Sequence, residues 1–179
     1  MTSIALIGFM GSGKSTVGKM LARQLKKPFY DLDQEVINKV GMEIRDIFSK
    51  YGESYFREVE SDVLSSLQVN NCIVATGGGI VESEDNQQIL KSKYLTFWLK
   101  ADFNTISNRL IGDKARPLWS QDRDKKMDLF NRRQLLYERS SNKVIDVNDL
   151  EIKETTDLIL RYIYFYTRFY NSSQYDKKL

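Results

Sequence analysis

Eight residues near the start of the chain have the types and spacing that bind phosphate. Residues 8–15 read GFMGSGKS and match G-x-x-x-x-G-K-[ST], the phosphate-binding P-loop, at every fixed position. The glycines allow the backbone to curl, so that successive N–H groups converge on phosphate oxygens at the positive end of a helix. The residues expected to contact a nucleoside triphosphate are Gly11, Ser12, Gly13, Lys14, Ser15 and Thr16.

Three side chains of this loop have separate expected roles. Lys14 would reach the β- and γ-phosphates as a point charge, and Ser15 would offer its hydroxyl to Mg²⁺. Thr16 adds a donor near the α-phosphate. The alternative is a glycine-rich turn with no ligand. The flanking segments argue against it, because residues 3–7 are short, apolar and branched like a buried parallel strand, and residues 17–25 have helical apolar spacing.

The next predicted strand, residues 29–33, ends in two carboxylates. Asp31 and Asp33 are two residues apart, so both would lie on one face of that strand. Asp33 could instead cap the helix that follows. Beside a P-loop the functional interpretation gains weight, because ligands of open α/β sheets bind at the carboxyl ends of the strands. One carboxylate could then hold the water shell of a metal, and the other could accept a proton from a substrate hydroxyl.

Further candidate residues lie later in the chain. Arg57 and Glu60 are three apart on a predicted helix, which favours a surface ion pair unless a substrate anion lies nearby. Three consecutive glycines, residues 77–79, end the predicted strand 72–76, and no simple turn requires all three. We interpret them as a close approach of the backbone to a ligand.

A polar segment at residues 112–123 contains Arg116 and is broken by Pro117. We expect a mobile lid over the phosphate site, and the alternative is an ordinary solvated loop.

The elements that must position these residues alternate along the chain. Strands are predicted at 3–7, 29–33, 72–76, 94–99 and 143–147, with helical patterns between them and a closing helix from residue 151. This alternation predicts one α/β domain, residues 1–179, on a parallel sheet. The aromatic tail, about 162–179, is expected to continue the last helix and pack on the body, with a contact surface for a partner as the second option.

Bulk composition limits the classes of function. The chain has 179 residues, a net charge of +3 and one cysteine, and it has no histidine, which excludes histidine acid–base and metal chemistry. The mild charge suits an anionic substrate and does not argue for nucleic acid. A single cysteine fits a reducing compartment. With neither a signal peptide nor an apolar run of bilayer length, we expect a cytoplasmic protein that does not bind membranes.

With these residues in place the sequence resembles the shikimate kinases from Ile4 to about Val147. The resemblance rests on the P-loop, on D-x-D at residues 31–33, on GE at 52–53 with FR-x-x-E at 56–60, on GGG at 77–79, on RPL at 116–118, and on Arg133 four residues before Tyr137. It implies a P-loop NTPase fold of the nucleoside-monophosphate-kinase type. Such a fold has three layers, a five-stranded parallel sheet flanked by helices, and a mobile lid.

The resemblance also implies an activity, the MgATP-dependent phosphorylation of the 3-hydroxyl of shikimate by a cytoplasmic monomer. Carried over by motif, the residues that hold shikimate are Asp33, Arg57, Gly77, Gly78, Gly79 and Arg133. Lys14 and Arg116 would stabilise the transferring phosphoryl group, and Arg109 would lie beside the adenine. Ser15 would bind Mg²⁺ directly, and Asp31 through water.

Two other classes of protein compete with this interpretation. A GTPase switch requires D-x-x-G, which occurs nowhere in the chain. Another small-metabolite kinase, such as a gluconate-type or nucleoside monophosphate kinase, shares the P-loop but lacks the set formed by Arg57, the three glycines and Arg133.

Overall fold

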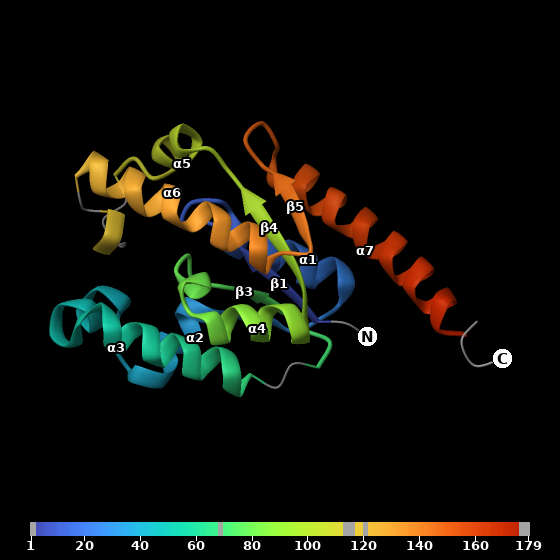
Figure 1. Cartoon of the computed structure of the whole chain (residues 1–179), viewed down its shortest axis with the longest axis horizontal. Helices are drawn as coiled ribbons and strands as arrows, with labels where there is room; N and C mark the ends of the chain where they lie inside the picture. The colour runs from blue at the N-terminus through green and yellow to red at the C-terminus, as the bar shows by residue number, and fades with distance from the viewer. Residues whose placement is uncertain (1–2, 68–69, 113–116, 120–121, 176–179) are drawn as a thin grey trace.

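A parallel sheet lies at the centre of the molecule. The computed structural model describes residues 3–67, 70–112, 117–119 and 122–175, with the backbone alone for residues 169–175. Within these residues five parallel strands form one sheet in the order β2-β3-β1-β4-β5 (Figure 1). The strands are β1 (Ser3–Ile7), β2 (Phe29–Asp31), β3 (Ile73–Ala75), β4 (Tyr94–Lys100) and β5 (Lys143–Asp146). The predicted α/β class and parallel sheet are confirmed.

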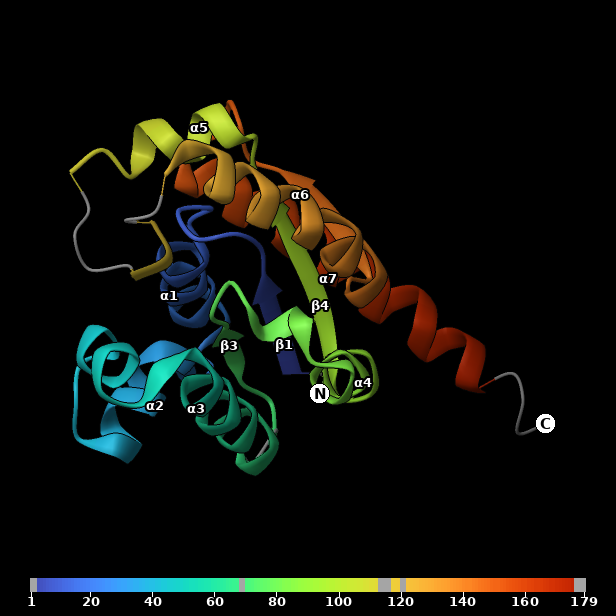
Figure 2. The same cartoon turned by 60° about the vertical axis from the view of Figure 1, so that its left-hand side comes forward.

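Helices cover both faces of this sheet. The α-helices are α1 (Lys14–Leu25), α2 (Leu32–Val40), α3 (Ile44–Ser66), α4 (Glu84–Lys93), α5 (Phe103–Arg109), α6 (Arg123–Ser140) and α7 (Ile152–Tyr175). Helices α1 and α7 pack together on one face, and α4 and α6 pack on the other (Figure 2). Short 3-10 turns are formed by Ile80–Glu82 and Pro117–Trp119. These layers bury an apolar core around the strands.

The central strand β1 carries the P-loop to the middle of the sheet. All five residues of β1 are buried, which is why the sequence there is almost entirely apolar. Ala5 pairs with Val74 of β3 on one side and with Thr96 of β4 on the other. The chain therefore continues from β1 to strands on one side first, β2 and β3, and then to strands on the other side, β4 and β5. Such a topological switch point leaves a crevice at the carboxyl ends of the strands.

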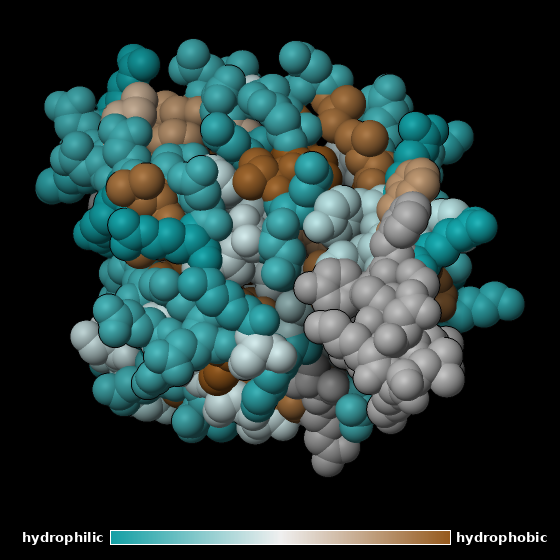
Figure 3. All heavy atoms as spheres, turned by 45° about the vertical axis from the view of Figure 1, so that its right-hand side comes forward, coloured by the Kyte–Doolittle hydropathy of each residue, from teal (hydrophilic) through white to brown (hydrophobic). Residues whose placement is uncertain are grey.

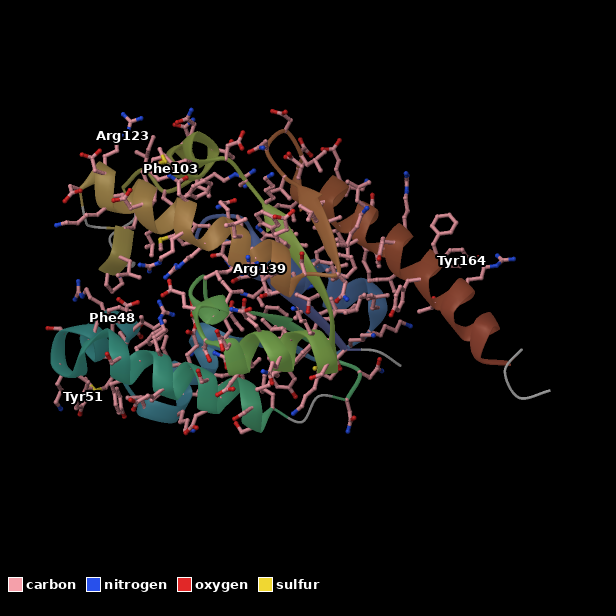
Figure 4. The ribbon with its side chains drawn as sticks, viewed as in Figure 1. Phe48, Tyr51, Phe103, Arg123, Arg139 and Tyr164 are labelled. Atoms are coloured by element: carbon pink, nitrogen blue, oxygen red, sulfur yellow. The ribbon has the colours of Figure 1, made fainter. Side chains whose placement is uncertain are left out.

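A pair of helices rises beside this crevice. Helix α2 ends at Gly41, whose φ of 75° is left-handed, and the chain then turns back into α3, which packs against α2. Gly52, with φ 82° and ψ 172°, interrupts the helical geometry of α3. Figure 4 shows Phe48 on the side of α3 that faces α6 and Tyr51 on the opposite side.

The closing helix α7 runs from β5 past the edge of the body (Figure 1). Tyr162 packs edge-on against Phe97 of β4, with ring centroids 5.4 Å apart. Tyr164 and Phe165 are 59% and 57% exposed, and Tyr164 points away from the body (Figure 4). The described part of the tail thus packs through one side and exposes the other.

No helix among the described residues is long and apolar enough to cross a membrane. The face shown in Figure 3 is mainly hydrophilic, and its apolar side chains form separate patches.

Candidate active site

The P-loop joins β1 to α1 in a conformation that its glycines make accessible. Gly8, Gly11 and Gly13 have φ of 141°, 79° and 96°, values that residues with a side chain rarely adopt. A Cβ on Gly8 would lie 2.5 Å from the carbonyl oxygen of Leu99, so this position also requires the absence of a side chain. The first turn of α1 then follows directly, with its N–H groups facing the loop.

Two polar side chains of the loop are buried. The Lys14 ammonium donates to the carbonyl oxygens of Gly8 at 2.8 Å and Phe9 at 2.9 Å. The hydroxyl of Ser12 has no partner among the described residues, which is unusual for a buried polar atom. A loop of this shape with an unsatisfied hydroxyl fits an anion such as a phosphate group.

Three more of the residues predicted to contact the nucleotide or its metal, Ser15, Thr16 and Arg109, are exposed. Ser15 and Thr16 are exposed in the first turn of α1. Arg109, at the end of α5, donates to the carbonyl oxygen of Val147 at 2.8 Å and to that of Gly11 at 3.5 Å. Arg109 therefore ties the P-loop to the segment that follows β5.

An open cavity of about 530 Å³ adjoins the P-loop. Every residue predicted to hold the substrate lines it, namely Asp33, Arg57, Gly77, Gly78, Gly79 and Arg133. The wall also contains Met10 of the P-loop and the aromatic rings of Phe48 and Phe56 from α3. The lining contains three arginines, Arg45 among them, and four acidic side chains, Asp33, Glu43, Asp46 and Glu60. The cavity thus combines apolar walls with charges of both signs, a composition suited to a small polar ligand that has an anionic group and hydroxyl groups.

Arg57 is held from both sides by carboxylates. Its Nη1 donates to Glu60 at 2.7 Å, while its Nη2 and Nε donate to Glu53 at 3.0 and 3.3 Å. Burial opposes the positive charge, but the two carboxylates outweigh it and raise the pKa of Arg57. Burial raises the pKa of Glu60 and the nearby Asp33 adds to this, although Arg57 and Arg133 lower it. The predicted ion pair between Arg57 and Glu60 exists, and it lies in the cavity wall.

The three glycines adjoin these charged side chains. A Cβ on Gly77 would collide with Oε1 of Glu60, and a Cβ on Gly79 would overlap the Arg57 guanidinium. A Cβ on Gly78 would lie 3.2 Å from the backbone nitrogen of Met10. None of the three has a positive φ. The absence of side chains at these positions lets Glu60, Arg57 and the backbone of Met10 approach closely. The predicted approach to a ligand stays a prediction.

Arg133 projects from α6 into the same cavity. Its Nε donates to Glu82 Oε1 at 2.6 Å, and its side chain is only 1% exposed. Its Nη2 is buried with no partner among the described residues. Its guanidinium carbon lies 5.7 Å from the ring centre of Phe9, which links α6 to the P-loop. A buried guanidinium nitrogen without an acceptor is costly unless a ligand supplies one.

The two aspartates are separated by the start of a helix. Strand β2 ends at Asp31 and α2 begins at Leu32, so the prediction that both carboxylates share one face of a strand is wrong. Asp31 caps α2 by accepting the backbone N–H of Asp33 at 3.2 Å, and Asp33 is thereby left in the first helical turn, facing the cavity. The capping role weighed for Asp33 belongs to Asp31.

The predicted lid is described only in part. Arg116 lies outside the described residues. Pro117 and Leu118 line the cavity, and Trp119 is buried beside Phe9 and Phe103 with ring centroids 6.5 and 5.9 Å away. Residues 117–119 therefore pack on the body more than the polar composition of the segment suggested.

Sequence reasoning gave three important residues no role in the site. Glu60 was interpreted as a surface partner, yet its side chain is 1% exposed. Glu82 was not singled out, although it accepts from both Arg132 and Arg133. The hydroxyl of Tyr137 donates to the carbonyl oxygen of Gly78 at 2.5 Å, and the spacing of Tyr137 from Arg133, four residues, was the one available signal.

The described residues contain no group of three or more acidic or cysteine side chains that could hold a metal by themselves. Mg²⁺ in kinases commonly takes one or two protein oxygens and completes its shell with phosphates and water. The hydroxyl of Ser15 and the carboxylate of Asp31 are hard oxygen donors of that kind, so this donor set fits Mg²⁺.

Comparison with known proteins agrees with the geometry. A family model for shikimate kinases matches residues 10–164. The shikimate kinase of Enterococcus faecalis is 40% identical over 164 residues, covering 90% of this chain and 98% of its own.

Two solved structures are similar over most of their length. The shikimate kinase of Acinetobacter baumannii in complex with shikimate has a TM-score of 0.87 at 34% identity, covering 91% of this chain and 93% of its own. That of Aquifex aeolicus has a TM-score of 0.81 at 37% identity, covering 90% and 96%. With its P-loop, the adjoining cavity that contains Arg57 and Arg133, and these matches, the chain belongs to the shikimate kinase family.

Proposed function

We propose that the protein transfers the γ-phosphoryl group of MgATP to the 3-hydroxyl of shikimate, giving shikimate 3-phosphate and ADP. The observation that carries the proposal is the convergence of Arg57, Arg133 and Asp33 on one cavity that adjoins the P-loop. Shikimate has one carboxylate and three hydroxyl groups, and these match a cavity with guanidinium donors and a carboxylate acceptor. The shikimate in the Acinetobacter baumannii structure is consistent with this assignment.

The substrate carboxylate is assigned to the two arginines. Arg133 Nη2 is a buried donor without an acceptor among the described residues, and Arg57 lies across the three glycines from it. Arg57 already bonds Glu53 and Glu60, so it keeps its orientation while sharing its donors with the ligand. Asp33 accepts from the reacting hydroxyl and orients it toward the P-loop.

The nucleotide phosphates are assigned to the P-loop. The backbone N–H groups of residues 11–16 and the Ser12 hydroxyl surround the β-phosphate, and the Lys14 ammonium exchanges the Gly8 and Phe9 carbonyls for phosphate oxygens. Ser15 binds Mg²⁺ directly and Asp31 does so through water. When bound, the metal neutralises charge on the β- and γ-phosphates. Arg109, fixed beside Gly11, borders the adenine.

The remaining assignments concern the chain as a whole. We propose a single kinase domain, active as a monomer in the cytoplasm, with residues 112–123 as its lid. Arg116, outside the described residues, is assigned to the transferring phosphoryl group. An Arg116→Ala variant should then lose kcat while the affinity for shikimate stays nearly unchanged.

A substrate panel tests the proposed function. Purified protein with MgATP is supplied in turn with shikimate, gluconate and nucleoside monophosphates, and ADP release is followed. The proposal predicts rapid release with shikimate alone. A gluconate-dependent or nucleotide-dependent rate above the shikimate rate would favour another small-metabolite kinase, and GTP binding much tighter than ATP would favour a switch protein.

A further inference from the structure

Hydrogen bonds from Arg133 and Tyr137 attach α6 to the segment that contains the three glycines and Glu82. Arg133 Nε donates to Glu82 Oε1 at 2.6 Å, and one turn later the Tyr137 hydroxyl donates to the carbonyl oxygen of Gly78. Glu82 ends the 3-10 turn Ile80–Glu82, which directly follows the glycines. Residues 77–79 line the cavity, and Glu82, three residues later, binds the Arg133 guanidinium that lines it too.

The bond to Glu82 leaves the Arg133 guanidinium little orientational freedom. A guanidinium is planar and its five N–H donors have fixed directions, so the bond at Nε also restricts the directions in which the two Nη groups can donate. Nη1 lies 3.6 Å from the place that a Cβ on Gly78 would take, and the buried Nη2 has no acceptor among the described residues. Glu82 thus fixes the plane of a guanidinium that lines the cavity, and Nη2 of that guanidinium still has no acceptor among the described residues.

The charges around Glu82 support the same arrangement. Burial raises the pKa of the Glu82 carboxyl, but Arg133 and Arg132 outweigh it and hold that pKa below its usual range. The carboxylate is 28% exposed, and Arg132, its second partner, is 62% exposed and bonds it at 3.1 and 3.2 Å. The short bond to Arg133 is the better shielded of the two.

We propose that Glu82 is a positioning residue for the substrate anion and acts by fixing the orientation of the Arg133 guanidinium. The proposal rests on the proposed function, because it takes the substrate carboxylate as the acceptor of Arg133. This positioning effect differs from the effect that the negative charge of Glu82 has on the electrostatic potential of the cavity.

Removal of a carboxylate beside Arg133 would make the cavity more positive and would by itself strengthen the binding of an anion. Loss of orientation weakens the binding instead.

Kinetics of Glu82 variants separate these two effects. Glu82→Ala removes both the charge and the acceptor, and it should raise the KM for shikimate by about tenfold or more, the usual effect of losing a charge-assisted hydrogen bond. The KM for ATP should change little, and kcat should fall less than the KM for shikimate rises. Glu82→Gln keeps a carbonyl acceptor for Nε and should raise that KM much less. Glu82→Asp keeps the charge but is one methylene too short, so it should resemble Glu82→Ala.

Arg132→Ala is the matched control, because Arg132 bonds the same carboxylate from the exposed side and does not line the cavity. It should leave the KM for shikimate within about twofold, since exposed ion pairs contribute little. In an Arg133→Ala background, Glu82→Ala should cause no further increase. Thermal melts of each variant show whether the protein is folded.

Several results would overturn the proposal. One is an unchanged or lower KM for shikimate in both Glu82→Ala and Glu82→Gln, the result expected from charge alone. Another is an equal rise in the KM for ATP, which would indicate general damage, and a third is full additivity of Glu82→Ala with Arg133→Ala. A wild-type protein with no shikimate-dependent turnover would instead refute the proposed function, and the role of Glu82 with it.

Discussion

The Arg57 guanidinium lies against the Cα of Gly79, so close that a methyl group on Gly79 would occupy the place of the guanidinium. Glu53 and Glu60 hold Arg57 in this position by hydrogen bonds. The third glycine of the triplet is therefore required by a side chain that arrives from α3, 22 residues earlier in the chain.

Gly79→Ala should displace Arg57 and raise the KM for shikimate by about tenfold or more, with little change in the KM for ATP, because a charge-assisted contact is lost or misplaced. Gly41→Ala is the matched control. Its Cβ would meet nothing within 4 Å, but its φ of 75° is left-handed. It should cost roughly 1–2 kcal/mol of stability and leave both KM values unchanged. Equal effects of the two variants on shikimate would contradict this explanation of Gly79.

Arg57→Lys should be almost as harmful to shikimate binding as Arg57→Ala. A lysine ammonium is a point charge and cannot bond Glu53, Glu60 and a substrate carboxylate in fixed directions at once. Calorimetric titration with shikimate and with ATP gives the two affinities separately. If ATP affinity falls while shikimate affinity is kept, Arg57 has been assigned to the wrong ligand.

Lys14→Met should lower kcat by at least about 10²-fold, by analogy with the loss of one preorganised donor to a developing charge. The sequence suggests a loop lysine that contributes little to folding, but Lys14 is 8% exposed and donates to two loop carbonyls. The variant should therefore also lose about 1–3 kcal/mol of stability, since those carbonyls lose their donor. Chemical denaturation and single-turnover kinetics measure the two effects. A folded variant with near-normal kcat would refute the assigned role.

Glu82 should make the stability of the protein depend on pH. Its pKa in the folded state lies below its unfolded value because Arg133 and Arg132 outweigh burial. Its contribution is therefore fully present above the unfolded pKa of about 4.3 and is lost as pH falls through the folded pKa. Wild type should exceed Glu82→Gln in unfolding free energy near neutral pH, and the difference should narrow below about pH 4.3. A difference in unfolding free energy that widens on acidification would contradict a lowered pKa of Glu82 in the folded state.

The sequence was sufficient for features that depend on local pattern. The five strands and the P-loop follow from apolar periodicity and from the spacing of the glycines. The boundary at Asp31 was missed because a cap and a strand end place similar residues at the same position. A shift of two residues there moved Asp33 from a strand to a helix.

The missed parts of the site depend on contacts between distant segments. Glu82 and Arg133 are 51 positions apart, and no local pattern links an acid after a glycine run to an arginine on a later helix. Glu60 has the spacing of an exposed helical pair, and its burial becomes visible only when Gly77 is seen packed against it. Residues of this kind can be found only once the fold has brought the segments together.

The most direct test of the central claim is the identity of the product. The protein is incubated with MgATP and shikimate, and phosphorus and proton NMR determine which oxygen carries the phosphate while ADP is measured in parallel. We expect one phosphate ester, on the 3-hydroxyl, formed in equal amount with ADP. Phosphate on another hydroxyl, ADP released with inorganic phosphate alone, or no shikimate-dependent ADP would contradict it.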